Sequence, residues 1–582
     1  MESARRHVDQ LVALYNFSLP IANGMVKEFF VENHWTNAVP ESWREPLEEL
    51  PLDELAELLT SGVPVNTRTV WPLSLLAFVA SCHALRLPGQ FDARGEAGEG
   101  DVARPAHADI NGRCSEEAAV DTELRRSVKP KKMHEIVRLS AVADQLRRAV
   151  GCDAAVDVGS GLGYFSRTLA FECGWDTMGI EAVESNVVAA RQLDTYMVPR
   201  LRAKRGTDWA PGSLRHVTAW VPPTMTSAQF LALVVNPPPD DAARENASSA
   251  TDEGAAAPFD GGTDAAPRNT ALLGLHTCGD LACTLLRIYN KAGPAIGCII
   301  NVGCCYMHMS EPGHPARSAP RQVNAQDWAA AGYAEVRRAE EAAASVDPRL
   351  LVCQETQDSP HLPGFPLSGH VGSRGVRLGY HVREMACHST AAYAERLRES
   401  ARKGEAGEPT LQLHGRRAVL EIFLQRRPGY TELKRAKCGS IRNAAHMSFA
   451  EYCEQCFERV GLAPLTEEER LEIETDLAPL FSQWRRVVVF FALRQLLAPL
   501  WEALLLLDRL LFLAEEGHHA ALFPVFDPTL SPRNYALVGV RPSAEVTAET
   551  VAAALPPHAI AILQADAARA PAIVASTETE HS

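Results

Sequence analysis

Apolar residues recur at helical spacing over the first part of the chain. Leu11, Leu14 and Phe17 fall on one side of a helix, and the same spacing returns from Leu55 to Leu59. Prolines separate these segments, which predicts several short helices rather than one long helix. We therefore expect residues 1–88 to form a helical N-terminal region that packs as a cap on the rest of the chain.

A different pattern begins at residue 89. Residues 89–124 are rich in glycine, alanine and acidic residues, which predicts a flexible linker. Beyond the linker, short apolar runs alternate with helical segments, as in sheets whose parallel strands are joined by helices. The sequence thus predicts an α/β core over residues 125–310. The runs expected to form its strands are residues 154–158, 177–180, 217–221, 271–276 and 296–302.

One stretch of this core has a composition unlike the rest. Residues 240–270 are rich in alanine, aspartate and glycine. Such a segment cannot bury enough apolar surface to offset the entropy lost on ordering. We expect a disordered insertion whose deletion leaves the melting temperature nearly unchanged.

The C-terminal part is predicted to add a helical insertion and to complete the sheet over residues 311–542. Residues 521–526 and 534–540 are apolar runs joined by a turn, which predicts a hairpin. The alanine-rich residues 543–582 have no clear periodicity, so we expect a disordered tail.

The most apolar run of the chain covers residues 487–514. Charged residues interrupt it and Pro499 would kink it, so it predicts buried helices and no membrane span.

The clearest chemical signal lies between the first two predicted strands. Residues 154–158 end at three glycines in a G-x-G-x-G pattern, and a helical segment follows. Glycine is needed where the backbone takes a positive φ or lies against a ligand, and a helix N-terminus offers free N–H groups. The second strand ends in Glu181, where a nucleotide site places a carboxylate on ribose hydroxyls. The loop residues expected to bind a cofactor are Asp157, Gly159, Ser160, Gly161 and Gly163.

The spacing of these glycines favours S-adenosyl-L-methionine over a dinucleotide. Dinucleotide loops use G-x-G-x-x-G, whose third glycine allows the close helix packing of a pyrophosphate site. S-adenosyl-L-methionine has no phosphate, and it needs a glycine turn near its methionyl carboxylate and an acid on its ribose. A purely structural tight turn is the alternative interpretation.

Composition and charge narrow the classes of function. With 46% hydrophobic residues in 582, the chain can build a large core, and its formal net charge of −15 argues against a protein that coats nucleic acid nonspecifically. The first residues do not resemble a signal peptide, and the 14 cysteines are not arranged as a disulfide framework. We expect free thiols in the cytoplasm or nucleus.

A basic run precedes the first strand. It leads from Arg125 into a helix with apolar residues on one face. Its charged residues form either a solvated face or the rim of the cofactor site. In the second interpretation, Lys131, Lys132, His134 and Glu135 lie at the rim, and Lys132 and His134 contact substrate.

Polar and thiol residues follow the last two parallel strands. One strand ends in the segment His276–Asp280, and the next ends in Gly303–His308. Ligands of parallel sheets gather at the carboxyl ends of strands, so these residues are functional candidates. His276, Cys278, Cys304, Cys305 and His308 are also residue types that bind Zn²⁺, but their spacing matches no usual finger, so we expect buried thiols without a metal.

Several segments together resemble one family, the methyltransferase-like protein 25 family, whose relatives have been labelled ribosomal RNA adenine dimethylase domain-containing proteins. The resemblance is strong over residues 130–310 and looser to about residue 541. It rests on DVGSGLGYFSRTLA, GIEAVESNVVAARQ, GLHTCGDLA, NVGCCYM and RNYALVGVR. The paired HTCGDLA and GCCYMH segments are more remotely similar to tRNA 2′-O-methyltransferases.

The resemblance implies a Rossmann-like class I methyltransferase fold, with a mostly parallel seven-stranded sheet, that uses S-adenosyl-L-methionine. It implies that Asp157 and the glycines form the cofactor loop, that Glu181 holds the ribose, and that Cys304 and Cys305 line the substrate pocket. We expect Asp280 and His276 to serve the chemical step, although Asp280 is equally suited to capping the helix that follows it.

The favoured function is methyl transfer to a macromolecular acceptor, with RNA ahead of protein. A catalytically idle methyltransferase fold that serves as a binding or scaffold module is the alternative. The intact glycine loop and Glu181 argue against it, because an idle site does not need them.

Overall fold

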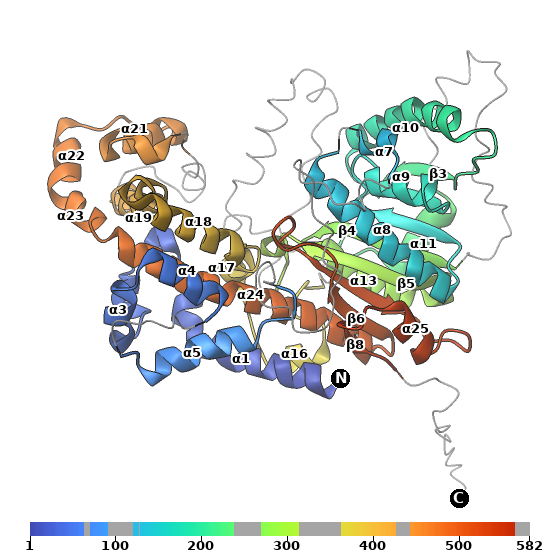
Figure 1. Cartoon of the computed structure of the whole chain (residues 1–582), viewed down its shortest axis with the longest axis horizontal. Coiled ribbons are helices and arrows are strands. Elements are labelled where there is room, and N and C mark those ends of the chain that lie inside the picture. The colour runs from blue at the N-terminus through green and yellow to red at the C-terminus, as the bar shows by residue number, and fades with distance from the viewer. Residues whose placement is uncertain are drawn as a thin grey trace, which may run out of the picture.

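The computed structural model describes residues 1–62, 70–90, 120–126, 128–237, 269–312, 362–426, 441 and 443–564. The predicted linker and insertion therefore lie largely outside the described residues. Figure 1 shows a sheet with its helices on one side of the molecule and a second, all-helical part on the other.

An eight-stranded sheet with the order β3-β2-β1-β4-β5-β7-β6-β8 forms the α/β part. Strands β1 to β5 are parallel, whereas β7 is antiparallel to β5 and β6, and β8 is antiparallel to β6. This arrangement confirms the predicted Rossmann-like α/β fold with a mostly parallel sheet. The expected number of seven strands is wrong, because β8 adds an eighth strand along the edge of β6. The strands are β1 (Ala154–Val158), β2 (Asp176–Glu181), β3 (Leu214–Thr218), β4 (Thr270–Cys278), β5 (Ile296–Cys304), β6 (His519–Pro524), β7 (Tyr535–Val540) and β8 (Ile560–Ile562).

Helices cover both faces of the sheet, which explains why its central strands are apolar along their whole length. On β4, Leu273 and Leu275 face a layer that includes α8, α9 and α25, while Leu272 faces the opposite layer with α13. The helices of this part are α7 (Thr122–Arg125), α8 (Pro130–Val150), α9 (Tyr164–Phe171), α10 (Glu184–Arg205), α11 (Ser227–Val235), α13 (Asp280–Lys291) and α25 (Ala548–Ala554).

The prediction of a disordered tail from residue 543 is wrong up to residue 564. Residues 548–554 form α25, whose Val551 is buried in one apolar layer of the sheet. Residues 560–562 form β8, which pairs with the outer edge of β6. A short edge strand gains its stability from pairing, so its sequence has little periodicity that could predict it.

The N-terminal region is helical, as predicted, and it packs on α24, the longest helix among the described residues. Side chains of α1 and α4 share one apolar cluster with α24. The N-terminal helices are α1 (Glu2–Asn23), α2 (His34–Asn37), α3 (Glu41–Glu48), α4 (Leu52–Thr60) and α5 (Leu73–Ala84).

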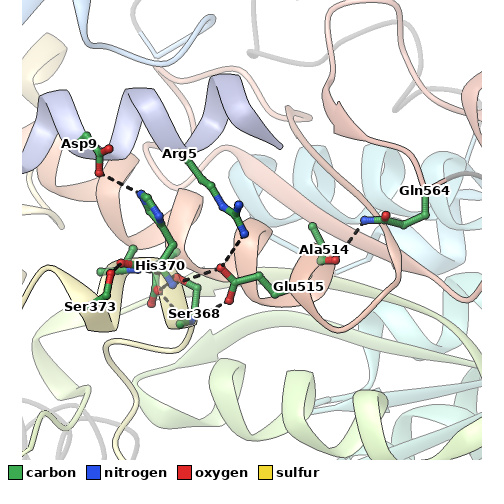
Figure 2. A network of polar contacts seen from close by, with 11 residues as sticks. Arg5, Asp9, Ser368, His370, Ser373, Ala514, Glu515 and Gln564 are labelled. Atoms are coloured by element: carbon green, nitrogen blue, oxygen red, sulfur yellow. Dashed lines mark hydrogen bonds and ion pairs between the residues drawn. The ribbon is translucent and has the colours of Figure 1, made fainter. Parts of the chain in front are cut away.

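A polar network joins α1 to residues 368–374 and to the end of α24 (Figure 2). Asp9 of α1 accepts hydrogen bonds from His370 at 2.9 Å and from two nitrogens of Arg374 at 2.8 Å. Arg5, one turn earlier, lies 3.7 Å from Glu515 at the end of α24. Although desolvation opposes it, hydrogen bonding to Arg374 and His370 holds the pKa of Asp9 below its ordinary value. The network positions α1 against the C-terminal half.

The C-terminal half adds a set of helices between β5 and β6. Among them, α19 and α21 enclose a separate small apolar cluster. The helices are α16 (Gly369–Ser373), α17 (Gly379–Met385), α18 (Thr390–Lys403), α19 (Glu408–Arg426), α21 (Phe449–Val460), α22 (Glu467–Glu472), α23 (Ala478–Phe481) and α24 (Trp484–Glu515).

Helix α24 connects the all-helical part to the sheet (Figure 1). It is a single helix of 32 residues that contains Pro499, and nearly all of it is buried. Among the described residues, no helix is long and apolar enough to cross a membrane. The buried charges of α24 have partners: Glu502 accepts a hydrogen bond from Tyr306, and Arg494 donates to the carbonyl of Gly24.

Asp508 of α24 organises the loop that leads into α16. Its carboxylate accepts hydrogen bonds from the backbone N–H groups of Leu367 and Ser368 and from the Ser368 hydroxyl, at 2.7–2.9 Å. Burial raises the pKa of this carboxyl to about 6 in spite of these bonds. Buried polar groups are costly without partners, so the loop and the helix depend on each other.

We predict that Asp508→Ala lowers the free energy of unfolding by about 3 kcal/mol, because it leaves three buried donors without an acceptor. The exposed Asp208 serves as the control, and Asp208→Ala is expected to change stability by less than about 0.5 kcal/mol. Urea unfolding of both variants measures the difference. Equal stabilities would show that Asp508 contributes nothing to the fold.

Candidate active site

The glycine loop folds as the sequence predicts. It follows β1, and Gly159, Gly161 and Gly163 all have positive φ, at 78°, 57° and 72°. Gly163 is the N-cap of α9. A Cβ atom there would overlap the ring of His216, a residue of β3 that lies against the loop. Side chains at these positions would be strained, which is why the loop requires glycine.

Glu181 lies beside the loop, at the carboxyl end of β2. Its Oε2 accepts a hydrogen bond from the backbone N–H of Gly161 at 2.8 Å, and its Oε1 accepts one from Val183 at 2.9 Å. Each oxygen of a carboxylate can accept a second hydrogen bond. The structure therefore brings the predicted acid and the predicted loop together, with capacity left to bind hydroxyl groups.

Asp157 and Lys132 lie near this loop. Asp157 is fully buried and accepts a hydrogen bond from Ser166 at 2.6 Å. Burial raises the pKa of Asp157 to about 6, with Ser166, His216 and Lys132 opposing the shift. Lys132 of α8 lies with its ammonium 5.0 Å from the centre of the Tyr164 ring, and burial lowers its pKa.

Not every predicted residue of α8 reaches the loop. His134 is buried, and its Nε2 accepts a hydrogen bond from the backbone N–H of Asp527 at 2.9 Å. The structure thus turns His134 toward the loop after β6 and away from the position expected of a substrate contact. A helix presents successive residues about 100° apart, so Lys132 and His134 cannot both face the same site.

A histidine–carboxylate pair lies at the carboxyl end of β4. His276 Nε2 is 2.9 Å from Glu135 Oε2, and Glu135 Oε1 accepts a hydrogen bond from Ser531 at 2.6 Å. The side chain of His276 is 37% exposed, whereas Glu135 is 1% exposed. Although burial opposes it, hydrogen bonds from His276 and Ser531 hold the pKa of Glu135 below its ordinary value.

The role of Glu135 needed the structure, and so did that of Ser531. Glu135 lies in the basic run, where its charge predicts only a polar residue at the rim of the site. Ser531 is 396 residues away from Glu135 in the sequence. Nothing in the sequence pairs either residue with His276. The pair fixes the imidazole, because the buried carboxylate holds one ring nitrogen and leaves the other for a ligand.

Asp280 occupies the first position of α13, and its side chain is turned inward. It is 5% exposed, and its Oδ1 accepts a hydrogen bond from the backbone N–H of Ser310 at 2.8 Å. Gly364 also packs against this carboxylate, since a Cβ atom there would overlap Oδ1. The contacts favour a structural role that holds these segments to α13, and the catalytic role of Asp280 stays a prediction.

Three thiols converge at the ends of β4 and β5. Cys278 and Cys304 are partners in the β4–β5 register, with their Sγ atoms 3.1 Å apart. The Sγ atoms of Cys278, Cys304 and Cys305 all lie within 4.8 Å of one another. Hydrogen bonds from the other two thiols hold the pKa of Cys305 well below its ordinary value, because they stabilise its thiolate.

Comparison with known proteins finds a family that matches this part of the chain. Residues 131–312 match the model of a methyltransferase domain family. The chain contains a methyltransferase domain. That domain spans all but the first residue of α8, the glycine loop, β1 to β5 and the three thiols, whereas Ser531, the partner of Glu135, lies outside it.

Two relatives carry the name "Probable methyltransferase-like protein 25", one from Mus musculus and one from Homo sapiens. Each is 28% identical over 274 residues, which is 46% of this chain. The match covers 37% of the mouse protein and 36% of the human protein, so the chain spans little more than a third of their length. The predicted resemblance to this family is confirmed.

The buried carboxyl of Asp157 predicts a specific dependence of stability on pH. Its folded-state pKa of about 6 lies above the ordinary value near 3.9, so between these values the folded protein keeps a proton that the unfolded chain loses. The contribution of this carboxyl to the free energy of unfolding therefore falls as the pH rises from about 4 to about 6, and it no longer changes above about pH 6. Asparagine cannot ionise, and its amide oxygen can still accept from Ser166.

We compare the free energy of unfolding of Asp157→Asn with that of the native protein at two pH values. We predict that the difference shifts in favour of Asp157→Asn by on the order of 1–3 kcal/mol when the pH is raised from about 4.5 to about 7.5. Asp153→Asn is the matched control, because Asp153 is exposed and lies four residues earlier. Thermal unfolding of the three proteins at both pH values measures the effect. A difference between Asp157→Asn and native protein that does not change with pH would contradict the shifted pKa.

Proposed function

We propose that this chain is an S-adenosyl-L-methionine-dependent methyltransferase that modifies a macromolecular acceptor, with RNA favoured over protein. The observation that carries the proposal is the contact between the Glu181 carboxylate and the backbone of the glycine loop at 2.8 Å. The contact supports the proposal, because a carboxylate beside a strand-to-helix turn suits the ribose hydroxyls of an adenosyl cofactor.

The residues present fit this cofactor. A Cβ atom at Gly161 would meet no other atom within 4 Å, and at Gly159 it would meet only Leu281, so the space over the loop is open. Glu181 would hold the ribose hydroxyls, and the loop backbone with the start of α9 would hold the methionyl carboxylate. The cofactor supplies an electrophilic methyl group on a sulfonium.

The pairing of His276 with Glu135 supports a hydroxyl acceptor. A sulfonium transfers its methyl group by in-line displacement, and a general base is needed only where the nucleophile carries a proton of high pKa. His276 is partly exposed at the carboxyl edge of the sheet, and Glu135 orients its ring. An RNA ribose offers such a hydroxyl, so this pair favours RNA over an amine of a protein.

The basic run at the start of α8 supports the same choice. Lys131 is 52% exposed and lies 3.8 Å from Glu135, so the run begins at the rim of the site. Phosphate contacts from lysine and arginine position a nucleic acid without reading its sequence. A local basic rim is compatible with the acidic net charge of the whole chain. An RNA-modifying role also agrees with the expected location in the cytoplasm or nucleus.

We predict that loss of the Glu181 carboxylate weakens cofactor binding. Glu181→Ala weakens the binding of S-adenosyl-L-methionine by about 1–3 kcal/mol, because the ribose hydroxyls lose their acceptor. Glu184→Ala is the matched control, since Glu184 is exposed three residues later at the start of α10. Isothermal calorimetry measures both affinities. Equal affinity of native protein and Glu181→Ala would remove Glu181 from the cofactor site.

We predict that RNA accepts the methyl group. With cofactor labelled in its methyl group, the chain labels RNA from total extracts, and alkaline hydrolysis leaves the label on dinucleotides because a methylated ribose cannot cyclise. His276→Ala lowers the rate at least about a hundredfold while cofactor affinity is kept, as expected for loss of a general base. The exposed His446→Ala is the control.

Two other results of this labelling assay would each contradict the proposed function. Label that enters only protein would reject RNA as the acceptor. Cofactor binding without any labelling of either extract would support the idle scaffold.

A further inference from the structure

The three thiols at the ends of β4 and β5 are brought together by an uncommon backbone conformation. Successive residues of a strand point to opposite faces, so Cys304 and Cys305 would ordinarily point apart. Cys305 instead has φ at 48°, in the left-handed region, and it turns directly into the short helix Tyr306–His308. This turn allows both sulfur atoms to lie near Cys278.

The strand on the other side has a similar irregularity. His276 has φ at 63°, and the β4–β5 register shifts between Leu275 and Thr277. Among the described residues, only four other than glycine have positive φ, and two of them, His276 and Cys305, border the thiols. Such conformations cost on the order of 1–3 kcal/mol each and persist where the surrounding structure requires them. Their position here points to a function for the convergence.

The geometry of the cluster suits a single metal ion. Three thiolates on one tetrahedral Zn²⁺, at a Zn–S distance of about 2.3 Å, lie roughly 3.8 Å from one another. The three sulfur atoms already lie within 4.8 Å, and Cys278 is exposed, which provides a path for the ion. Thiolates select zinc over magnesium and calcium, which prefer oxygen ligands.

We propose that Cys278, Cys304 and Cys305 form a three-thiolate site for Zn²⁺ at the carboxyl edge of the sheet. Sequence spacing argued against such a site, because adjacent cysteines rarely bind one tetrahedral ion, but the turn at Cys305 removes that objection. Three protein ligands leave a fourth position for water or another ligand, which is the pattern of an open site. The proposal does not depend on the proposed methyl transfer, since neither cofactor nor acceptor takes part.

The competing use of these sulfur atoms is a disulfide between Cys278 and Cys304, whose Sγ atoms are the closest pair. Forming it requires an oxidant that removes two electrons and leaves both thiols without their protons. Zinc binding requires no oxidant and releases only protons. The two uses are therefore separated by working under reducing conditions.

The experiment uses the full chain, purified with a reducing agent that does not bind metal and equilibrated with Zn²⁺, then freed of loose ions. Elemental mass spectrometry is expected to find about one zinc ion per chain. Cys278→Ser and Cys305→Ser are expected to lower the zinc content at least tenfold. Cys173→Ser is the matched control, because Cys173 is a partly buried free thiol outside the cluster, and it is expected to keep the ion.

A second measurement uses the native chain, so that misfolding of a variant cannot decide the result. Thiol alkylation with and without a strong chelator, followed by peptide mapping, is expected to show protection of Cys278, Cys304 and Cys305 that the chelator removes. Replacement of zinc by Co²⁺ is expected to produce sulfur-to-cobalt charge-transfer absorption in the near ultraviolet.

Three results would overturn the proposal. They are native protein that holds no zinc after equilibration, zinc that stays bound when the cysteines of the cluster are replaced, and alkylation of the three thiols that is indifferent to the chelator.

Discussion

The parallel pairing of β2, β1, β4 and β5 is the constraint on which the site depends. Parallel strands end at the same edge of a sheet, so residues that follow different strands meet there although they are far apart in the chain. Glu181 at the end of β2, the glycine loop after β1, and the thiols at the ends of β4 and β5 lie along one edge of the sheet for this reason. Helices bury both faces of the sheet that carries this edge.

Buried charges with definite partners tie the rest of the chain to that edge. Asp508 of α24 holds the loop that leads into α16, and Glu135 of α8 joins His276 of β4 to Ser531. Each carboxylate is surrounded by donors from segments distant in sequence, so neither half of the contact is stable alone. Helices and sheet are thereby fixed relative to one another around the site.

Much of this protein was accessible from its sequence because the signals are local. Strand runs, the glycine loop and the acid after β2 depend on side chains within a few residues, and the backbone of Gly159, Gly161 and Gly163 has the positive φ that their spacing predicts. The burial of α24 was also evident, since charges are too frequent within its apolar run for a membrane span. The match of residues 131–312 to a methyltransferase domain agrees with these local signals.

Tertiary structure decided the features that depend on pairing between distant segments. Strand β8 exists because β6 has an edge to pair with, and the inward turn of His134 and of Asp280 follows from what packs against α8 and α13. The convergence of the three sulfur atoms depends on the left-handed backbone conformation of Cys305. The residue type at this position does not predict that conformation. A sequence determines which side chains are present and which local backbone conformations have a low free energy. Only tertiary packing determines which of those side chains face one another.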